Sequence, residues 1–196
     1  MGLLNTFDLN QYIQKYNTSI FIETGTGIGQ GITYAQSFPF KQLYTIEIIK
    51  KLYDENVIKL KDNKTELILN NSISGLTEIL SKVLQTDTIL FWLDAHFPGA
   101  DYQMGNYADT WEKNIKTPLE DELILISSIR KNNKDVFLID DLRLYEDGNY
   151  DCGSIDRTKY GNCNGVEFVF NLFSNTHDIV KSYKHEGYLI VTPKIG

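Results

Sequence analysis

The stretch that decides the fold is residues 21–31, which read FIETGTGIGQG. An apolar run ends at the acid Glu23, a glycine-rich turn follows, and the residues after the turn can open a helix. Glycine takes positive φ readily and lets backbone N–H groups approach a ligand closely. This order is typical of a parallel strand that delivers its carboxyl end to a nucleotide-like ligand. The alternative interpretation of a lone glycine cluster is a flexible turn without a ligand.

The spacing of the glycines separates two classes of cofactor. Gly25, Gly27 and Gly29 form the pattern G-x-G-x-G, and Gln30 stands where a dinucleotide fingerprint has its third glycine. The turn is therefore off-pattern for NAD and fits better the acid-x-G-x-G turn of S-adenosylmethionine enzymes. The residues expected to bind this cofactor here are Glu23, Thr24, Gly25, Gly27 and Gly29.

Length and composition indicate one globular domain that covers residues 1–196, because 196 residues of which 42% are hydrophobic can bury a sizeable core. The net charge of −7 disfavours a nucleic-acid partner, since proteins that grip nucleic acid usually carry a basic face. No apolar run approaches the roughly 20 residues of a membrane span, and no secretory segment follows Met1, so we expect a cytoplasmic protein. Cys152 and Cys163 do not have the spacing of a zinc site.

Outward from the glycine turn, strands alternate with helices along the chain. This alternation predicts a Rossmann-like α/β fold: a seven-stranded, mostly parallel sheet with helices on both faces and a C-terminal antiparallel hairpin. Within the helices, Asp8 is expected to cap the first, and Val57 and Leu84 are expected to face inward. The predicted strands are 19–24, 43–47, 66–70, 88–94, 135–140, 177–184 and 187–192, and the predicted helices are 8–16, 28–38, 48–61, 73–84, one that starts at 117–120, and 165–174.

Polar residues stand where the predicted strands end, at the edge at which such sheets bind ligands. Glu47 ends the second strand, 22 residues after Gly25, and its carboxylate can accept hydrogen bonds from ribose hydroxyls; a solvated strand-end acid is the alternative. Asn71 and Ser72 follow the third strand, where an adenine edge would lie, although either can instead cap the next helix. Glu23 would lie beneath the methionine end of the cofactor.

A second group of polar residues follows strands four and five, which are expected neighbours. Asp94, Asp140 and Asp141 would converge there, and three carboxylates repel one another unless a cation neutralises them. Mg²⁺ or another divalent ion is the simplest solution. His96, with an ordinary pKa of about 6.5, can act as a general base. The alternatives are strand-end acids and turn caps without metal, and a loop histidine or an additional ligand.

These residues resemble class I S-adenosylmethionine-dependent methyltransferases over nearly the whole chain. The resemblance rests on Ile22–Gly27, Ile46–Glu47, Asn70–Ser72 and Leu93–His96, and Asn71 departs from the acid that is frequent at its position. The acidic residues are similar to those of metal-dependent sugar O-methyltransferases of the macrocin type, and more loosely to glycan-modifying methyltransferase domains of large DNA viruses. Carried over by position, Asp94, Asp140 and Asp141 would hold the metal and His96 would be the base. The long 95–116 insertion and a histidine at 96 depart from that pattern.

The resemblance implies an S-adenosylmethionine-dependent O-methyltransferase, with Asp94 and His96 in catalysis and a sugar or glycan hydroxyl as acceptor. Loops 95–116 and 142–164 would cover that acceptor; they contain Tyr102, Tyr107, Trp111, Tyr145, Tyr150 and Tyr160. Three alternatives stay open: a metal-independent methyltransferase acting on a small molecule, a non-catalytic module of a glycan-synthesis assembly, and an NAD-dependent oxidoreductase, which Gln30 disfavours.

Overall fold

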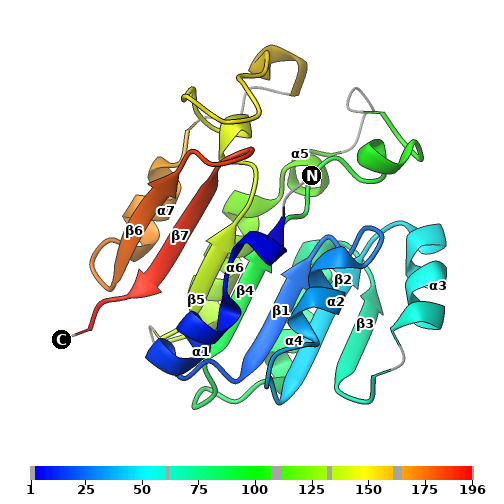
Figure 1. The fold of residues 1–196 in the computed structure, drawn as a ribbon, viewed down its shortest axis with the longest axis vertical. Helices are drawn as coiled ribbons and strands as arrows, with labels where there is room; N and C mark the ends of the chain where they lie inside the picture. The colour runs from blue at the N-terminus through cyan, green and yellow to red at the C-terminus, as the bar shows by residue number, and fades with distance from the viewer. Residues whose placement is uncertain (1–2, 61, 107–111, 132–133, 161–164, 196) are drawn as a thin grey trace.

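The computed structural model describes residues 3–60, 62–106, 112–131, 134–160 and 165–195. Its centre is one seven-stranded sheet with the strand order β3-β2-β1-β4-β5-β7-β6 (Figure 1). The predicted Rossmann-like fold is confirmed, and strand bounds differ from the predicted ones by only one or two residues. The strands are β1 (Ile20–Thr24), β2 (Gln42–Glu47), β3 (Thr65–Leu69), β4 (Ile89–Leu93), β5 (Val136–Ile139), β6 (His177–Ser182) and β7 (Tyr188–Pro193).

The sheet is parallel from β3 to β5, and the C-terminal hairpin of β6 and β7 is antiparallel. β7 inserts between β5 and β6, so the last connection is a tight turn and not a helical crossover. Because β1, β2, β4 and β5 run in the same direction, their carboxyl ends meet at one edge of the sheet. That edge carries the polar residues singled out in the sequence.

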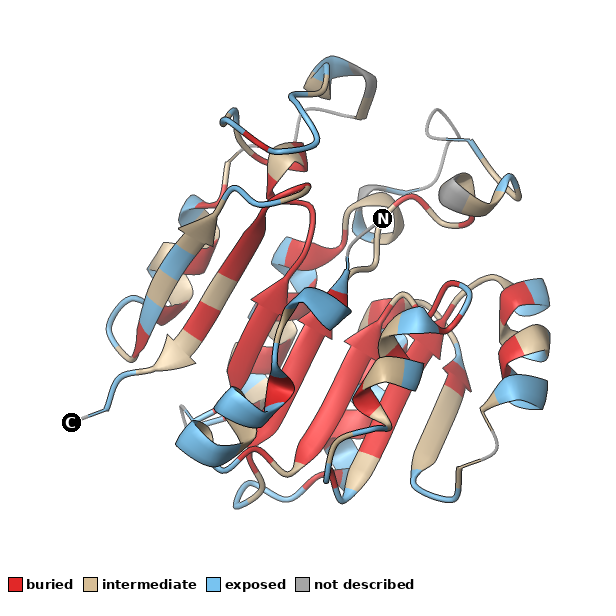
Figure 2. Cartoon of the chain, in the orientation of Figure 1, coloured by how far each residue is buried: buried red, intermediate tan, exposed pale blue. Residues whose placement is uncertain are grey.

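Helices cover both faces of the sheet (Figure 1). On one face lie α1 (Leu9–Tyr16) and α2 (Gln30–Ala35), and on the other lie α4 (Ser72–Lys82), α6 (Leu119–Ile129) and α7 (Glu167–Phe173), while α3 (Lys50–Lys59) packs beside β3 at the edge. The central strands β1, β4 and β5 are buried on both faces (Figure 2). Continuous apolar runs such as 89–93, ILFWL, are therefore what these positions require.

Two apolar layers make up the core, one on each side of the sheet. Trp92 lies in the α1–α2 layer together with Phe21, and Phe91 stacks on Phe137 in the opposite layer, with ring centroids 5.0 Å apart. The alternation of side chains along β4 sends neighbouring residues into different layers. Trp92 is thus a core residue.

A buried ion pair joins the C-terminal end of α6 to the residue before β5. The Arg130 guanidinium bonds both Asp135 carboxylate oxygens, with Nε 2.8 Å from Oδ2 and Nη2 3.1 Å from Oδ1. Its Nη1 donates to the Leu84 carbonyl. Both charged side chains are buried, so removing either one leaves the charge of the other without its counter-ion.

Three local predictions are wrong. Val57 is 50% exposed, because the inner stripe of α3 runs at i, i+4 spacing through Leu52, Asn56 and Leu60. Leu84 is 67% exposed, because α4 ends at Lys82. The helix predicted over 28–38 is shorter than expected, because α2 covers only Gln30–Ala35.

The connecting segments contain short helices that the sequence patterns do not predict. They are η1 (Leu4–Thr6), η2 (Ala100–Tyr102), α5 (Lys113–Lys116), η3 (Leu142–Leu144) and η4 (Arg157–Tyr160). The Asp8 cap of α1 is as predicted, since Oδ1 of Asp8 accepts from the Asn10 N–H at 3.0 Å.

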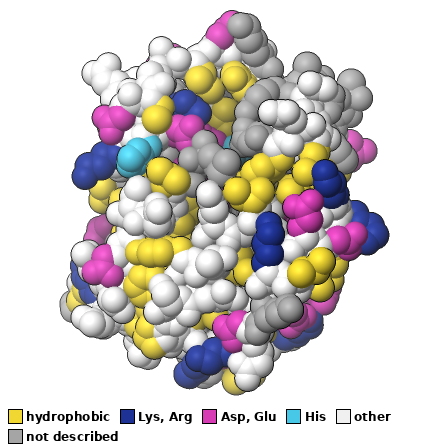
Figure 3. Space-filling view, turned by 45° about the vertical axis from the view of Figure 1, so that its right-hand side comes forward, with side chains coloured by type: hydrophobic (Ala, Val, Ile, Leu, Met, Phe, Trp, Pro, Cys, Tyr) yellow, Lys and Arg dark blue, Asp and Glu magenta, His cyan; other side chains and the backbone are white. Residues whose placement is uncertain are grey.

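Acidic and basic side chains are interspersed on the face seen in Figure 3, with hydrophobic patches between them. In the ranges of the chain described above, no helix is both long and apolar enough to cross a bilayer.

Candidate active site

The glycine turn adopts the backbone that its composition predicts. Gly25 has φ 82° and Gly27 has φ 54°, a region that side chains other than glycine rarely occupy. A Cβ on Gly25 would lie 2.7 Å from the Asp94 carbonyl oxygen, and one on Gly27 would collide with the Tyr102 hydroxyl. The turn therefore packs directly against the end of β4 and against η2.

Asn56 holds this turn in place from α3, and sequence reasoning missed it. Its side chain is fully buried, and Nδ2 donates to the Gly27 carbonyl at 2.7 Å and to the Leu52 carbonyl at 2.9 Å. The available signal was the i, i+4 spacing from Leu52, which puts a polar residue on the apolar stripe of the helix. A buried amide in that position needs partners, and the turn supplies one.

A pocket opens beside the glycine turn, with about 680 Å³ of empty space, part of it open to solvent. The pocket brings together seven of the predicted residues: Gly25, Gly27, Glu47, Asn71, Ser72, Asp94 and His96. Its other lining residues are Ile46, Ile48, Leu52, Asn70, Ala95, Phe97, Pro98, Gly99, Tyr102 and Ile115.

Glu47 closes one side of the pocket and binds two backbone N–H groups. Oε2 accepts from Gly27 at 2.8 Å and Oε1 accepts from Ile49 at 2.8 Å. Burial raises the pKa of Glu47, and these two hydrogen bonds oppose the shift. Each carboxylate oxygen has a second lone pair, so Glu47 can still accept a hydroxyl from a ligand in the pocket.

Asn71 and Ser72 lie at the start of α4, on the pocket wall. Oδ1 of Asn71 accepts from the Ser74 N–H at 2.9 Å, so Asn71 is the N-cap of this helix. The capping role that the sequence left open is confirmed, and it leaves the side-chain amide N–H₂ of Asn71 as the group that could face a ligand.

Three predicted cofactor residues do not line the pocket: Glu23, Thr24 and Gly29. Glu23 lies beneath α2, where Oε2 accepts from the Thr45 hydroxyl at 2.5 Å. Burial raises the pKa of Glu23 to about 8, and the hydrogen bond from Thr45 opposes this shift. The parts of these three residues in cofactor binding stay predictions.

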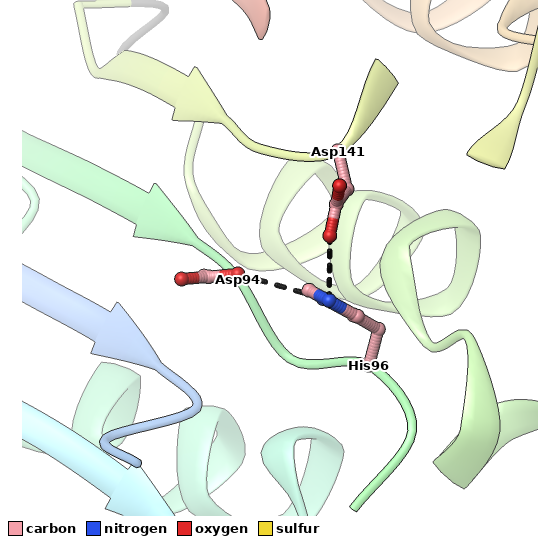
Figure 4. A group of neighbouring side chains, drawn as sticks. All are labelled: Asp94, His96 and Asp141. Atoms are coloured by element: carbon pink, nitrogen blue, oxygen red, sulfur yellow. Dashed lines mark ion pairs between the residues drawn. The ribbon is translucent and has the colours of Figure 1, made fainter. Parts of the chain in front are cut away.

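The second predicted group does assemble. The His96 ring lies between the carboxylates of Asp94 and Asp141 (Figure 4), with Nε2 2.6 Å from Oδ2 of Asp141 and Nδ1 3.4 Å from Oδ1 of Asp94. Asp140 lines the same small inner cavity as these three residues. β4 and β5 are adjacent parallel strands, which is why Asp141 meets Asp94 and His96, 47 and 45 positions before it in the sequence.

The backbone of Asp141 is unusual for a residue other than glycine. Asp141 has φ 54°, in the left-handed region, where aspartate is tolerated better than most residues. Arg143 follows in η3, with Nε 3.4 Å from Oδ1 of Asp141 and Nη2 2.7 Å from Oε1 of Glu186. The turn before β7 thus approaches the acidic residues through Glu186, which sequence reasoning missed.

Electrostatics separate the three aspartates. Burial, and then the negative charge of Asp141, raise the pKa of Asp94 well above its ordinary range. Burial, and then the charges of Asp94 and Asp141, raise the pKa of Asp140 in the same way. Burial would also raise the pKa of Asp141, but His96 and Arg143 outweigh it and the pKa is lowered.

The donor atoms here fit a hard divalent cation. Both carboxylate oxygens of Asp140 are buried without a hydrogen-bond partner, and such orphaned oxygens require a cation or a proton. Asp94, His96 and Asp141 offer atoms within 4.8 Å of one another, as do Asp140, Asp141 and Glu186. The predicted ligands Asp94, Asp140 and Asp141 therefore fall into two overlapping groups that share Asp141.

Glu122 is a further acid that the sequence analysis missed. It lies in the first turn of α6 and lines the inner cavity, almost completely buried. Burial raises the pKa of Glu122 to about 7, although the Ser72 hydroxyl opposes the shift. The signal in the sequence was a glutamate beside Leu123 on the buried stripe of the helix.

The aromatic residues of the loops mostly pack locally. Tyr102 lines the pocket and Tyr145 lines the inner cavity, whereas Tyr150 packs on Tyr183 and Tyr160 packs on Phe97. Two further aromatic residues from the sequence analysis, Tyr107 and Trp111, lie outside the described residues.

With this geometry in view, solved structures supply the comparison. An O-methyltransferase from Bacillus cereus, solved in complex with S-adenosylhomocysteine (SAH), matches with a TM-score of 0.58 and 11% identity over 95% of this chain and 79% of that one. The fold is that of class I methyltransferases. A protein assigned as a caffeoyl-CoA O-methyltransferase from Staphylococcus aureus has a TM-score of 0.63 and 15% identity, over 99% of this chain and 85% of that one.

The class I methyltransferase fold does not by itself fix the acceptor. An rRNA methylase from Streptococcus thermophilus also matches, with a TM-score of 0.53 and 14% identity over 95% of this chain and 94% of that one. No protein-family model matches the sequence, and no curated protein sequence matches it significantly. At such identities the likeness is one of fold, and function has to be argued from the site.

Proposed function

We propose that this chain is an S-adenosylmethionine-dependent O-methyltransferase that acts on a hydroxyl of a small molecule, with help from a divalent ion. The observation that carries the proposal is that Asp94 and His96 line both cavities: the pocket of the glycine turn and the inner acidic cavity. A methyl donor and an acidic centre would thus meet at the end of β4. A glycine-turn pocket without the acidic residues would support cofactor binding only.

The residues of the pocket have separate parts in binding. The turn at Gly25 and Gly27 lets a ligand approach the backbone, Glu47 accepts hydroxyls of a ribose, and Asn71 offers its amide to a base. S-adenosylmethionine bound there would supply an electrophilic methyl group on its sulfonium. The wall formed by Ile46, Ile48 and Leu52 excludes water from the apolar part of the ligand.

The acidic residues would prepare the acceptor. Asp94, Asp140 and Asp141 would hold a divalent ion, which lowers the pKa of a coordinated hydroxyl and fixes its direction. His96, which lies beside these aspartates, would take the proton from that hydroxyl. Holding both reactants in line supplies much of the rate enhancement.

Within this proposal, a sugar or glycan is the acceptor that we favour. Adjacent hydroxyls of a sugar can chelate one ion, and Tyr102 and Tyr145 place aromatic groups at the two cavities. A metal-independent transfer is the second candidate. It is supported by His96 and Arg143, which already balance the charge of Asp141.

The test is a methyl-transfer screen that measures formation of S-adenosylhomocysteine with deoxysugars, glycans and catechols, with Mg²⁺ and with a chelator. The proposal expects turnover with at least one hydroxyl acceptor and its loss on chelation. Turnover that survives chelation supports the metal-independent candidate. Binding of S-adenosylmethionine without turnover on any acceptor would instead indicate a non-catalytic module.

A further inference from the structure

Both ring nitrogens of His96 face carboxylates. Nε2 lies 2.6 Å from Oδ2 of Asp141, and Nδ1 lies 3.4 Å from Oδ1 of Asp94. A general base needs the acceptor hydroxyl within hydrogen-bond reach of a ring nitrogen, and here a carboxylate oxygen stands beside each nitrogen. His96 therefore has to leave at least one carboxylate before it can serve as a base.

The ring also stands where a cation would bind. Asp94, Asp141 and His96 itself each offer one donor atom, and these three atoms lie within 4.8 Å of one another (Figure 4). A divalent ion bridging two carboxylates has its ligand oxygens at about 2.0–2.6 Å, so it would occupy the space between them. A single imidazole cannot turn both of its nitrogens to the same ion, and it fills that space now.

A second observation shows that the cavity is prepared for a ligand beyond His96. Asp140 is 3% exposed and lines the same cavity, yet neither of its carboxylate oxygens has a partner. The His96 ring faces one oxygen each of Asp94 and Asp141, and it leaves Oδ1 of Asp141 and both oxygens of Asp140 without a hydrogen-bond partner. An ion that joined Asp140 to the other two aspartates would satisfy all three.

We propose that His96 and the divalent ion are mutually exclusive occupants of the space between Asp94 and Asp141, so that ion binding expels the ring and thereby frees it as the base. The inference rests on the proposed function for the ion and for the role of His96. It adds an order of events: the enzyme without metal is held inactive by its own base, and the ion releases it.

Competition and ligation predict opposite effects of removing the ring. If His96 competes with the ion, we expect His96→Ala to bind Mn²⁺ about tenfold or more tightly than the wild type. In the variant the ion no longer has to break a hydrogen bond to a charged group, and the free energy of such a bond corresponds to a factor of this size in Kd. If His96 is a ligand, the same substitution weakens binding. His96→Gln serves as a second variant, since its amide keeps polarity in the cavity, and it is expected to bind more tightly as well.

The measurement is calorimetric titration of Mn²⁺ into the full chain, without cofactor or acceptor, so it does not depend on methyl transfer. Arg143→Gln is the charge control, because it removes a cation 3.4 Å from Asp141 that does not stand between the aspartates. We expect it to tighten Mn²⁺ binding less than His96→Ala does, because its contact with Asp141 is longer than that of His96. Tightening by Arg143→Gln as large as that by His96→Ala would assign the effect to charge and overturn the proposal.

A spectroscopic readout checks the movement itself. The chain has three histidines, and Mg²⁺ is diamagnetic, so their ring C–H resonances can be followed during a Mg²⁺ titration. The proposal expects the His96 signals, assigned by their loss in His96→Ala, to shift with the ion while the other two stay in place. Unchanged His96 signals at saturating Mg²⁺, weaker binding by His96→Ala, or no binding to either protein would each overturn the proposal.

Discussion

Replacing Glu23 with glutamine is expected to stabilise the protein at alkaline pH and not at acidic pH. Glu23 lies under α2 with its carboxyl buried, and burial raises its pKa from 4.5 to about 8. At pH values between these two pKa values, the Glu23 carboxyl keeps its proton in the folded chain and loses it in the unfolded chain. The free energy of unfolding therefore falls as the pH rises, because the unfolded state binds fewer protons.

The size of the effect follows from the same two values. Each pKa unit corresponds to about 1.36 kcal/mol, so the cost of Glu23 grows by about 1.4 kcal/mol per pH unit and approaches about 5 kcal/mol above pH 8. Structural relaxation reduces such figures, and we expect about 2–5 kcal/mol in practice. Glutamine keeps the shape and can still bond the Thr45 hydroxyl, but it has no proton to lose.

The assay is urea unfolding of the wild type and of Glu23→Gln at pH 5, 6, 7 and 8. The variant should gain little at pH 5 and most at pH 8. Glu120→Gln removes an exposed glutamate and should change the free energy of unfolding by less than about 0.5 kcal/mol. A difference between Glu23→Gln and wild type that stays constant or shrinks with pH would show that Glu23 is ionised in the folded state and refute the reasoning.

Three further predictions concern the glycine turn and the ion pair between Arg130 and Asp135. Asn56→Ala removes two hydrogen bonds and leaves the Gly27 carbonyl buried without this donor. We expect the free energy of unfolding to fall by about 1–3 kcal/mol and S-adenosylmethionine to bind more weakly. Unchanged affinity would show that Asn56 does not hold the glycine turn in its binding conformation. Gly27→Ala places a Cβ against the Tyr102 hydroxyl, at a residue with φ 54°. We expect calorimetry to show cofactor binding weakened by at least about tenfold, and the added substitution Tyr102→Ala to restore part of the affinity. If it restores none, the backbone strain alone causes the loss. Asp135→Ala leaves the buried Arg130 guanidinium without its carboxylate partner. We expect the free energy of unfolding in the same urea assay to fall by about 3–5 kcal/mol. A decrease below about 1 kcal/mol would contradict the importance of this ion pair.

Patterns of apolar residues were sufficient to predict the sheet. Runs such as 89–93 and 136–139 are apolar throughout, and only strands buried on both faces satisfy such runs in a chain that alternates strands with helices. The acids at the strand ends were also predictable, because parallel neighbours bring Asp94 and Asp141 to one edge.

What the sequence could not supply was the direction of individual side chains. Glu23 and Thr24 are consecutive in one strand, so they point to opposite faces, and neither lines the pocket. Asn56 and Glu122 were missed because a polar residue on a helix is ordinarily assigned to its solvent side, and only tertiary contacts show that these two are buried. No pattern in the sequence specifies the left-handed backbone of Asp141 or the position of His96 between two carboxylates.

The most direct test of the account is one calorimetric comparison of S-adenosylmethionine and NAD binding to the wild-type chain and to Glu47→Ala. The account predicts saturable 1:1 binding of S-adenosylmethionine to the wild type, clearly weaker binding to Glu47→Ala, and no heat of binding with NAD. Binding of NAD in place of S-adenosylmethionine, or S-adenosylmethionine binding that Glu47→Ala leaves unchanged, would contradict the claim that the pocket beside the glycine turn holds a methyl donor.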